Sequence, residues 1–136
     1  MIKTIKYFFE AFFVYSFFLI GKLIGLSLSR KVFSFIFKIM GPIIRSNKII
    51  DKNLLKFSKE LSHKKKNEII SNMWSNYGKT FIEYAFLKKF KKGKLHINIE
   101  GEKILNDIYI NKKPVIFISG HFANFELMSM EITKRQ

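Results

Sequence analysis

One short segment combines the residue types that carry proton-transfer chemistry. His121 directly follows Gly120, and Glu126 lies five residues after the histidine. Histidine is the usual general base near neutral pH. A carboxylate can hydrogen-bond the imidazole, fix its tautomer and stabilise the imidazolium that forms during a reaction. The segment predicts a catalytic pair, although a histidine followed by a glutamate at this spacing also occurs by chance with a purely structural role.

The spacing of the pair sets a condition on the local structure. On a continuous helix, residues five positions apart lie about 140° around the axis, so the two side chains would not easily meet. They can meet if His121 lies on a turn and Glu126 in the first turn of a helix. Gly120 permits that break and a close approach to a ligand. Asn124 either caps the helix or positions a substrate, so Gly120 and Asn124 are the candidate substrate-binding residues.

The elements around this segment predict an α/β fold. Residues 115–119 form a continuous apolar run typical of a strand covered on both faces, and residues 95–100 alternate as in a half-buried strand. Residues 101–111 are predicted to be a short helix. Ligand sites in α/β sheets form at the carboxyl ends of strands, where His121 would lie. We expect residues 93–136 to be the start of an α/β domain that the sequence leaves truncated, because two strands make a poor sheet.

Residues 30–92 are predicted to be a helical region. Residues 30–40 have the pattern of an amphipathic helix, either beside a membrane or as the first core helix, and Gly41-Pro42 is predicted to end it. The clearest helical periodicity runs through residues 69–85. Its aromatic stripe is interpreted as core rather than as a surface for an acyl chain, and consists of Trp74, Tyr77, Phe81 and Tyr84.

Residues 1–29 are predicted to be a membrane anchor helix. From residue 11 to residue 29 only Lys22 is charged, and nineteen helical residues rise about 28 Å, close to the thickness of the hydrocarbon layer. A cleaved signal peptide and a helix lying in the interface are the alternatives. Most lysines follow this segment, so the rest of the chain is expected on the cytoplasmic side of the membrane.

The formal charge of +15 leaves three classes of partner open: nucleic acid, anionic lipid and an acidic protein. Many of the lysines can also reflect an AT-rich genome. The cluster from Lys88 to Lys94 is interpreted as a basic turn, either simply solvated or a dock for an acidic carrier protein or anionic head groups. No motif for nucleic-acid binding is present, so nucleic acid is not an expected partner.

Several kinds of site are not expected. The chain has no cysteine, which excludes disulfides and thiolate chemistry. His63 and His96 are interpreted as surface residues, so no set of metal ligands is evident. A phosphate-binding glycine loop is also missing. We therefore expect no metal and no cofactor.

The His121 to Glu126 segment resembles the His-x4-Glu/Asp motif of glycerolipid-type acyltransferases, and specifically the late acyltransferases of lipid A biosynthesis (the lauroyl/myristoyl transferase family). Three other features follow the order of that family and extend the resemblance over nearly the whole chain. They are a hydrophobic N-terminal helix before Gly41-Pro42, a Met-Trp-x-Asn-x-Gly helix continuing to Glu-Tyr at Met73–Tyr84, and the pair Gly101-Glu102.

The resemblance implies transfer of a fatty acyl group from acyl-acyl carrier protein to a hydroxyl of a lipid A precursor, in lipopolysaccharide biosynthesis at the bacterial inner membrane. His121 would remove the hydroxyl proton and Glu126 would orient His121. Because the family is longer, we do not expect these 136 residues to be active alone. Two alternatives stay open: another membrane glycolipid or glycerophosphate as acceptor, and an inactive basic module that binds membrane surfaces.

Overall fold

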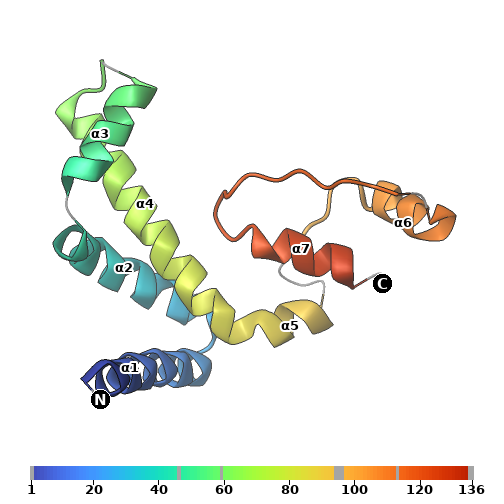
Figure 1. Cartoon of the computed structure of the whole chain (residues 1–136), viewed down its shortest axis with the longest axis horizontal. Coiled ribbons are helices and arrows are strands. Elements are labelled where there is room, and N and C mark those ends of the chain that lie inside the picture. Colours follow the sequence, from blue (N-terminus) through green and yellow to red (C-terminus); the bar gives the residue numbers. More distant parts are fainter. Residues whose placement is uncertain (1, 46, 59, 94–96, 113, 135–136) are drawn as a thin grey trace. The chain divides into compact units, whose positions relative to one another are not determined.

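The computed structural model describes residues 2–45, 47–58, 60–93, 97–112 and 114–134, and the regular secondary structure in this part of the chain is all helical (Figure 1). It divides into two compact units, Met1–Ala85 and Phe86–Gln136. The elements in chain order are α1 (Ile2–Ile24), α2 (Leu26–Ile44), α3 (Asn47–Phe57), α4 (His63–Glu83), the 3-10 turn η1 (Tyr84–Phe86), α5 (Leu87–Lys92), α6 (Glu102–Asn111) and α7 (Glu126–Thr133).

The segment predicted as one anchor helix over residues 1–29 contains two helices, divided at Gly25. This residue has a φ of 79°, a left-handed conformation that glycine adopts without steric cost. The buried Ser29 hydroxyl donates 2.7 Å to the carbonyl of Gly21 and lies 2.6 Å from the carbonyl of Gly25. Gly21 in turn packs so closely on Ile82 that a methyl group there would clash with the Ile82 side chain. The corner between α1 and α2 is therefore held by specific contacts within the first unit.

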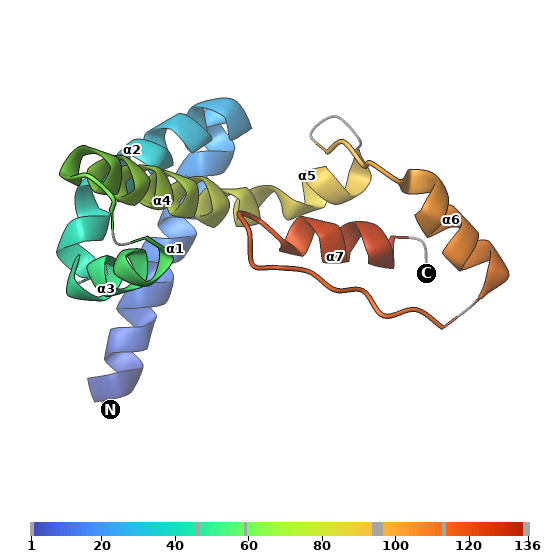
Figure 2. The same ribbon diagram turned by 90° about the horizontal axis from the view of Figure 1, so that it is seen from above.

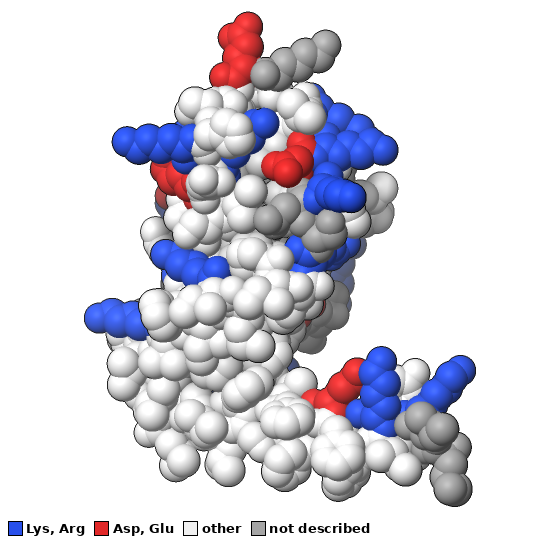
Figure 3. Space-filling model, turned by 90° about the vertical axis from the view of Figure 1, so that its left-hand side faces the viewer, with Lys and Arg blue, Asp and Glu red and all other residues white. Residues whose placement is uncertain are grey.

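Helix α1 is long and apolar enough to cross a membrane, judged by its length and composition. Its most apolar window has a mean hydropathy of 1.6, and only 6% of that window is buried inside the structure. Large apolar side chains such as Phe8, Phe12 and Leu23 lie exposed along it. Figure 3 shows a broad uncharged surface at the lower left of this face, with charged side chains, most of them basic, above it and at the lower right. The helix therefore presents apolar side chains on most of its surface.

The core of the first unit lies between α2 and α4, which pack side by side (Figures 1 and 2). The buried hydroxyls of Ser34 and Ser75 are 2.6 Å apart. Gly78 allows the two helices to approach closely, because a Cβ atom there would lie 2.2 Å from the backbone carbonyl oxygen of Phe33. Small residues at the contact thus permit backbone approach along this helix pair.

An ion pair and an aromatic cluster complete the packing of α4. The Arg30 Nε donates to the Glu83 carboxylate at 2.7 Å, with the Glu83 side chain only 10% exposed. Phe81 lies within 5.4–6.5 Å, centroid to centroid, of four other phenylalanine rings. These rings come from α1 and α2 and are Phe17, Phe18, Phe33 and Phe37.

The aromatic stripe of α4 is core only in part. Trp74 is buried and Phe81 is central to the ring cluster, but Tyr77 is 56% exposed and Tyr84 is also exposed. The apolar face of α4 is narrower than the sequence pattern indicated, because α2 and α1 together cover only one side of the helix.

Gly41-Pro42 does not end the helix as predicted, because α2 continues to Ile44. Proline removes one backbone donor from a helix interior, yet the turn closes past it through the hydrogen bond from Arg45 N to Gly41 O at 3.1 Å. Gly41 is buried directly against Trp74, and a Cβ atom on it would lie 2.0 Å from the indole ring. The glycine therefore serves helix packing at this position.

The predicted α/β fold is wrong. In the part of the chain that the structure describes, residues 97–100 and 115–119 form no strand, and residues 95 and 96 lie outside the described residues. Ile116 and Ile118 are 89% and 92% exposed, so the apolar run is not covered on both faces. A strand needs a neighbouring backbone to satisfy its N–H and C=O groups, and apolar composition alone does not supply one. The predicted helix at 101–111 is confirmed as α6, which follows Gly101 with a φ of 80°.

Candidate functional site

The chain folds back on itself between Gly120 and α7. The Phe122 N–H donates 2.9 Å to the Gly120 carbonyl, which closes a three-residue turn. Ala123 then adopts a left-handed φ of 45°. The helix α7 begins at Glu126, with a hydrogen bond from Leu127 N to Asn124 O at 3.2 Å. His121 thus lies on the turn, and Glu126 is the first residue of the helix.

The turn brings His121 onto Phe125. The two rings stack, with centroids 4.0 Å apart and planes inclined by 10°. His121 is exposed, so the imidazole is accessible from solution. Among the described residues, no hydrogen bond or ion pair joins His121 to Glu126. The structure therefore places the two residues on adjoining parts of one turn, with Phe125 as the direct neighbour of the imidazole.

The two candidate substrate-binding residues have different settings. Gly120 is exposed, and the left-handed residue of the turn is Ala123 rather than this glycine. A Cβ atom on Gly120 would meet the exposed Phe122 ring at 2.5 Å. Asn124 is partly buried, and the N-cap residue of α7 is Phe125. The left-handed conformation at Ala123 has no signal in the sequence, because alanine rarely adopts it.

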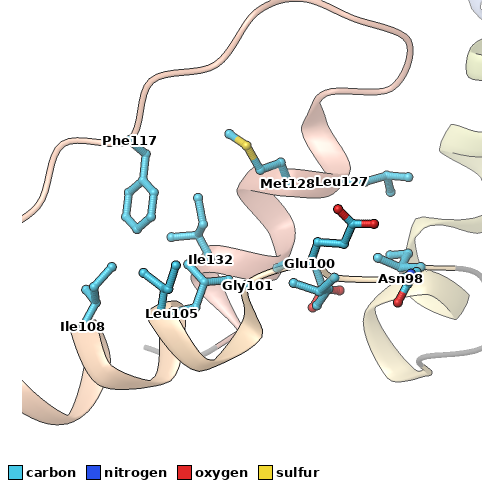
Figure 4. Close-up of a pocket in the computed structure, with 13 residues that line it drawn as sticks. Asn98, Glu100, Gly101, Leu105, Ile108, Phe117, Leu127, Met128 and Ile132 are labelled. Atoms are coloured by element: carbon cyan, nitrogen blue, oxygen red, sulfur yellow. The ribbon is translucent and has the colours of Figure 1, made fainter.

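A cavity of about 480 Å³ lies within the second unit, beside the turn. Its wall begins one residue after Glu126, with Leu127 and Met128 of α7. In Figure 4, side chains from three segments converge on this space: Leu105 and Ile108 from α6, Phe117 from the extended segment, and Ile132 from α7. Sequence reasoning missed this cavity because its lining is distributed over segments that were predicted to be strands and helices of a sheet.

One buried charge borders the cavity. Glu131 is 8% exposed, and its carboxylate pairs with the Lys134 ammonium three residues later. The same ammonium donates 3.1 Å to the backbone carbonyl of Phe90, a residue of α5 that is 1% exposed. The pair therefore offsets the buried charge and links α5 to α7. Its i,i+3 spacing is a signal that the sequence carried.

Helix α5 presents a basic surface. Phe90 is its buried residue, and four lysines are exposed around it: Lys88, Lys89, Lys91 and Lys92. The region predicted as a basic turn is thus helical as far as Lys92, and Lys94 lies outside the described residues. Because Lys134 links α5 to α7, these lysines belong to the same unit as His121.

The other histidines and the acidic residues form no evident metal site. His63 is exposed at the start of α4, and His96 lies outside the described residues. Among the residues that the structure describes, no group of three or more His, Cys, Asp or Glu side chains is placed to hold a metal ion.

Comparison with known families gives a match over nearly the whole chain. Residues 2–136 match the family model described as bacterial lipid A biosynthesis acyltransferase. No curated protein and no solved structure matches the chain. The matched segment includes both units and the turn that carries His121 and Glu126.

Proposed function

The chain belongs to the bacterial lipid A biosynthesis acyltransferase family, and we propose that it transfers a fatty acyl group from acyl-acyl carrier protein to a hydroxyl of a lipid A precursor. The observation that carries the proposal is the family match over residues 2–136, which includes the His121-x4-Glu126 sequence. The product would be an ester, so the enzyme would be an O-acyltransferase.

In the proposed reaction, an imidazole nitrogen of His121 accepts the proton of the acceptor hydroxyl as its oxygen attacks the thioester carbonyl. The tetrahedral intermediate collapses, the carbon–sulfur bond breaks, and the carrier thiolate takes the proton back from the imidazolium. The products are the acylated lipid and the free carrier thiol. General-base catalysis of this kind contributes roughly 10² to 10⁴ in rate.

Glu126 would orient the imidazole and stabilise its protonated form. A carboxylate at the start of α7 lies where the helix dipole is favourable to negative charge. In the reactive arrangement, the imidazole would leave the Phe125 ring and hydrogen-bond the Glu126 carboxylate. The exposure of His121 supports this step, because exposed side chains change rotamer within nanoseconds.

The cavity beside the turn supports binding of an acyl chain. Its volume of about 480 Å³ falls within the range of small-molecule sites. Most of its lining is aliphatic or aromatic, as illustrated by Leu105, Phe117 and Ile132. Burial of a fatty chain in such a space gains about 0.8 kcal/mol per methylene group. The adjacent position of Glu126 would bring the chain's carbonyl end toward the catalytic pair.

One basic surface and one apolar surface support the choice of partners. The exposed lysines of α5 would attract an acidic carrier protein and raise its rate of encounter. The apolar helix α1 would hold the enzyme in the inner membrane, where the acceptor lipid lies, with the second unit on the cytoplasmic side. These assignments agree with donor and acceptor molecules that meet at a membrane surface.

The direct test is an acyl-transfer assay on the native protein that contains this sequence, reconstituted in phospholipid vesicles. A labelled acyl thioester would be supplied either on acyl carrier protein or on coenzyme A. The acceptors would be a lipid A precursor, another membrane glycolipid and glycerol phosphate. We expect an ester product that requires both the carrier-bound donor and the lipid A precursor. Product on glycerol phosphate alone, or no product with any pair, would reject the proposal.

A further inference from the structure

Helix α2 has two apolar sides, and only one of them packs on α4. Phe33, 2% exposed, and the buried Gly41 lie on the packed side. The other side carries a stripe of residues at spacings of seven and four, which fall on one face of a helix. We call these residues the α2 stripe; they are 50%, 65%, 53% and 81% exposed in the order Leu28, Phe35, Ile39 and Ile43.

Two basic residues flank the α2 stripe. Lys31 and Lys38 are seven positions apart, so they share one edge of the helix, and both are exposed. At 100° per residue they lie about 75–95° from the centre line of the stripe. An exposed apolar stripe with lysines at its border is the pattern of a helix that lies in a membrane interface, with the lysine stems along the apolar layer and the ammonium groups at the head groups.

Along the chain, the α2 stripe follows directly on the exposed apolar residues of α1. The Ser29 hydroxyl lies within hydrogen-bond distance of the carbonyls of Gly21 in α1 and of Gly25 at the corner, and so holds the corner between the two helices. Helix α1 exposes large apolar residues up to Leu23, two residues before the corner at Gly25. The face of this unit seen in Figure 3 has a broad uncharged area at its lower left, with charged side chains, most of them basic, above it and at the lower right. An uncharged surface of this extent beside a basic one fits an anionic bilayer.

We propose that the α2 stripe inserts into the interfacial layer of an anionic phospholipid bilayer, with Lys31 and Lys38 at the lipid head groups. The membrane contact would then include two helices, because α2 packs against the bilayer on one side and against α4 on the other. The inference goes beyond the acyl-transfer proposal and shares with it only the placement of α1 in a membrane.

The absence of cysteine from the chain allows a direct test by site-specific labelling. Single variants Phe35→Cys and Ile43→Cys would carry an environment-sensitive fluorophore. Asn72→Cys, at an exposed position of α4, is the aqueous control, and Phe12→Cys in α1 is the membrane control. Each labelled protein would be reconstituted in vesicles of phosphatidylethanolamine and phosphatidylglycerol. Iodide would report contact with water, and phospholipids spin-labelled near the head group would report contact with lipid.

The proposal predicts that probes at positions 35 and 43 are quenched severalfold more by spin-labelled lipid, and severalfold less by iodide, than the probe at position 72. Lys31→Glu with Lys38→Glu should weaken lipid quenching at position 35 in these vesicles and change it little in phosphatidylcholine vesicles. Circular dichroism would check that each variant keeps its helical content.

Two results would overturn the proposal. Iodide quenching at position 35 equal to that at position 72 would mean that the stripe faces water. Protection from iodide without lipid quenching would mean that a second copy of the chain or another protein surface covers it. A probe at position 12 that contacts water would show that α1 does not lie in the membrane. Lipid quenching at position 35 would still show whether the α2 stripe contacts lipid.

Discussion

The first unit pairs several polar side chains in its core, whereas the candidate site of the second unit lies on an exposed turn. In the unit Met1–Ala85, several buried polar side chains bond to one another within the helix packing, as in the Ser34–Ser75 contact and the Arg30–Glu83 pair. In the unit Phe86–Gln136, the histidine of the candidate site is exposed on a turn. Buried polar groups of this kind stabilise a single arrangement, whereas an exposed imidazole is available to a substrate.

The contacts that hold the helices together and the candidate catalytic residues therefore lie in different units of the chain. Two of the motifs that resemble the family meet in packing contacts of the first unit: Gly41 lies against Trp74 of the Met73–Tyr84 motif, and Gly78 of that motif lies against Phe33. The histidine motif lies in the second unit, and the lining of the cavity includes Leu127, the residue after Glu126. Variants of the first unit should therefore change stability, and variants of the turn or of α5 should change transfer.

The largest effect short of removing the histidine is expected for Glu126→Gln. The amide keeps the shape of the side chain but loses the charge that supports the imidazolium, so kcat should fall on the order of 10²–10³-fold. KM should change little, and Glu126→Asp should restore part of the rate. Glu68→Gln, an exposed carboxylate on α4, is the control. An unchanged kcat in Glu126→Gln would remove this residue from the mechanism.

Next in size is Arg30→Ala, which breaks the ion pair in the first unit. The Glu83 carboxylate, 10% exposed, would lose its partner at 2.7 Å, and the free energy of unfolding should fall by about 3 kcal/mol. Thermal unfolding followed by circular dichroism measures the effect. The matched control is Lys6→Ala, whose partner Glu10 is exposed, with an expected loss of about 0.5 kcal/mol. Equal losses for both variants would contradict the role assigned to burial.

A smaller loss of stability is expected for Gly78→Ala. The added methyl group would lie 2.2 Å from the Phe33 carbonyl oxygen, and a backbone atom cannot move aside cheaply. Overpacking of this kind costs about 2 kcal/mol. Gly93→Ala is the control, because the nearest atom to its methyl group would be 3.7 Å away. A melting temperature unchanged by Gly78→Ala would show that α2 and α4 can separate without cost.

The smallest expected effect concerns the surface of α5. Lys88→Glu with Lys91→Glu should raise KM for acyl-acyl carrier protein about tenfold, leave kcat nearly unchanged and flatten the dependence of KM on salt. Charge reversal of Lys52 and Lys56 on α3, both exposed, is the control for net charge. If both double variants raise KM equally, the attraction comes from the overall charge and not from α5.

Helical periodicity predicted that the first unit is helical, but it did not predict where the individual helices begin and end. The repeat of apolar residues in 69–85 marked α4, but α4 begins at His63. Ser62 accepts a hydrogen bond from Lys65 N at 3.3 Å, so a serine cap starts the helix before the apolar repeat begins. The division at Gly25 was also missed, because a single glycine in an apolar run does not show whether the helix continues.

The second unit was predicted less well, because a strand forms only when another backbone segment pairs with it, and the sequence pattern does not show that segment. Residues 115–119 are apolar, and only contacts between distant segments decide whether such a run pairs, is buried or stays exposed. The sequence did single out His121 and Glu126, since their identities and spacing are local. The stacking of His121 on Phe125 depends on the left-handed Ala123, for which the sequence carries no signal.

The central claim is that His121 is the general base of an acyl transfer, and the rate of transfer by His121→Ala tests it most directly. The measurement would use the native protein in vesicles with acyl-acyl carrier protein and a lipid A precursor, with His63→Ala as the matched histidine control. We predict a loss of about 10²–10⁴-fold for His121→Ala with unchanged helical content, and little loss for His63→Ala. Transfer at the wild-type rate by His121→Ala would contradict the account.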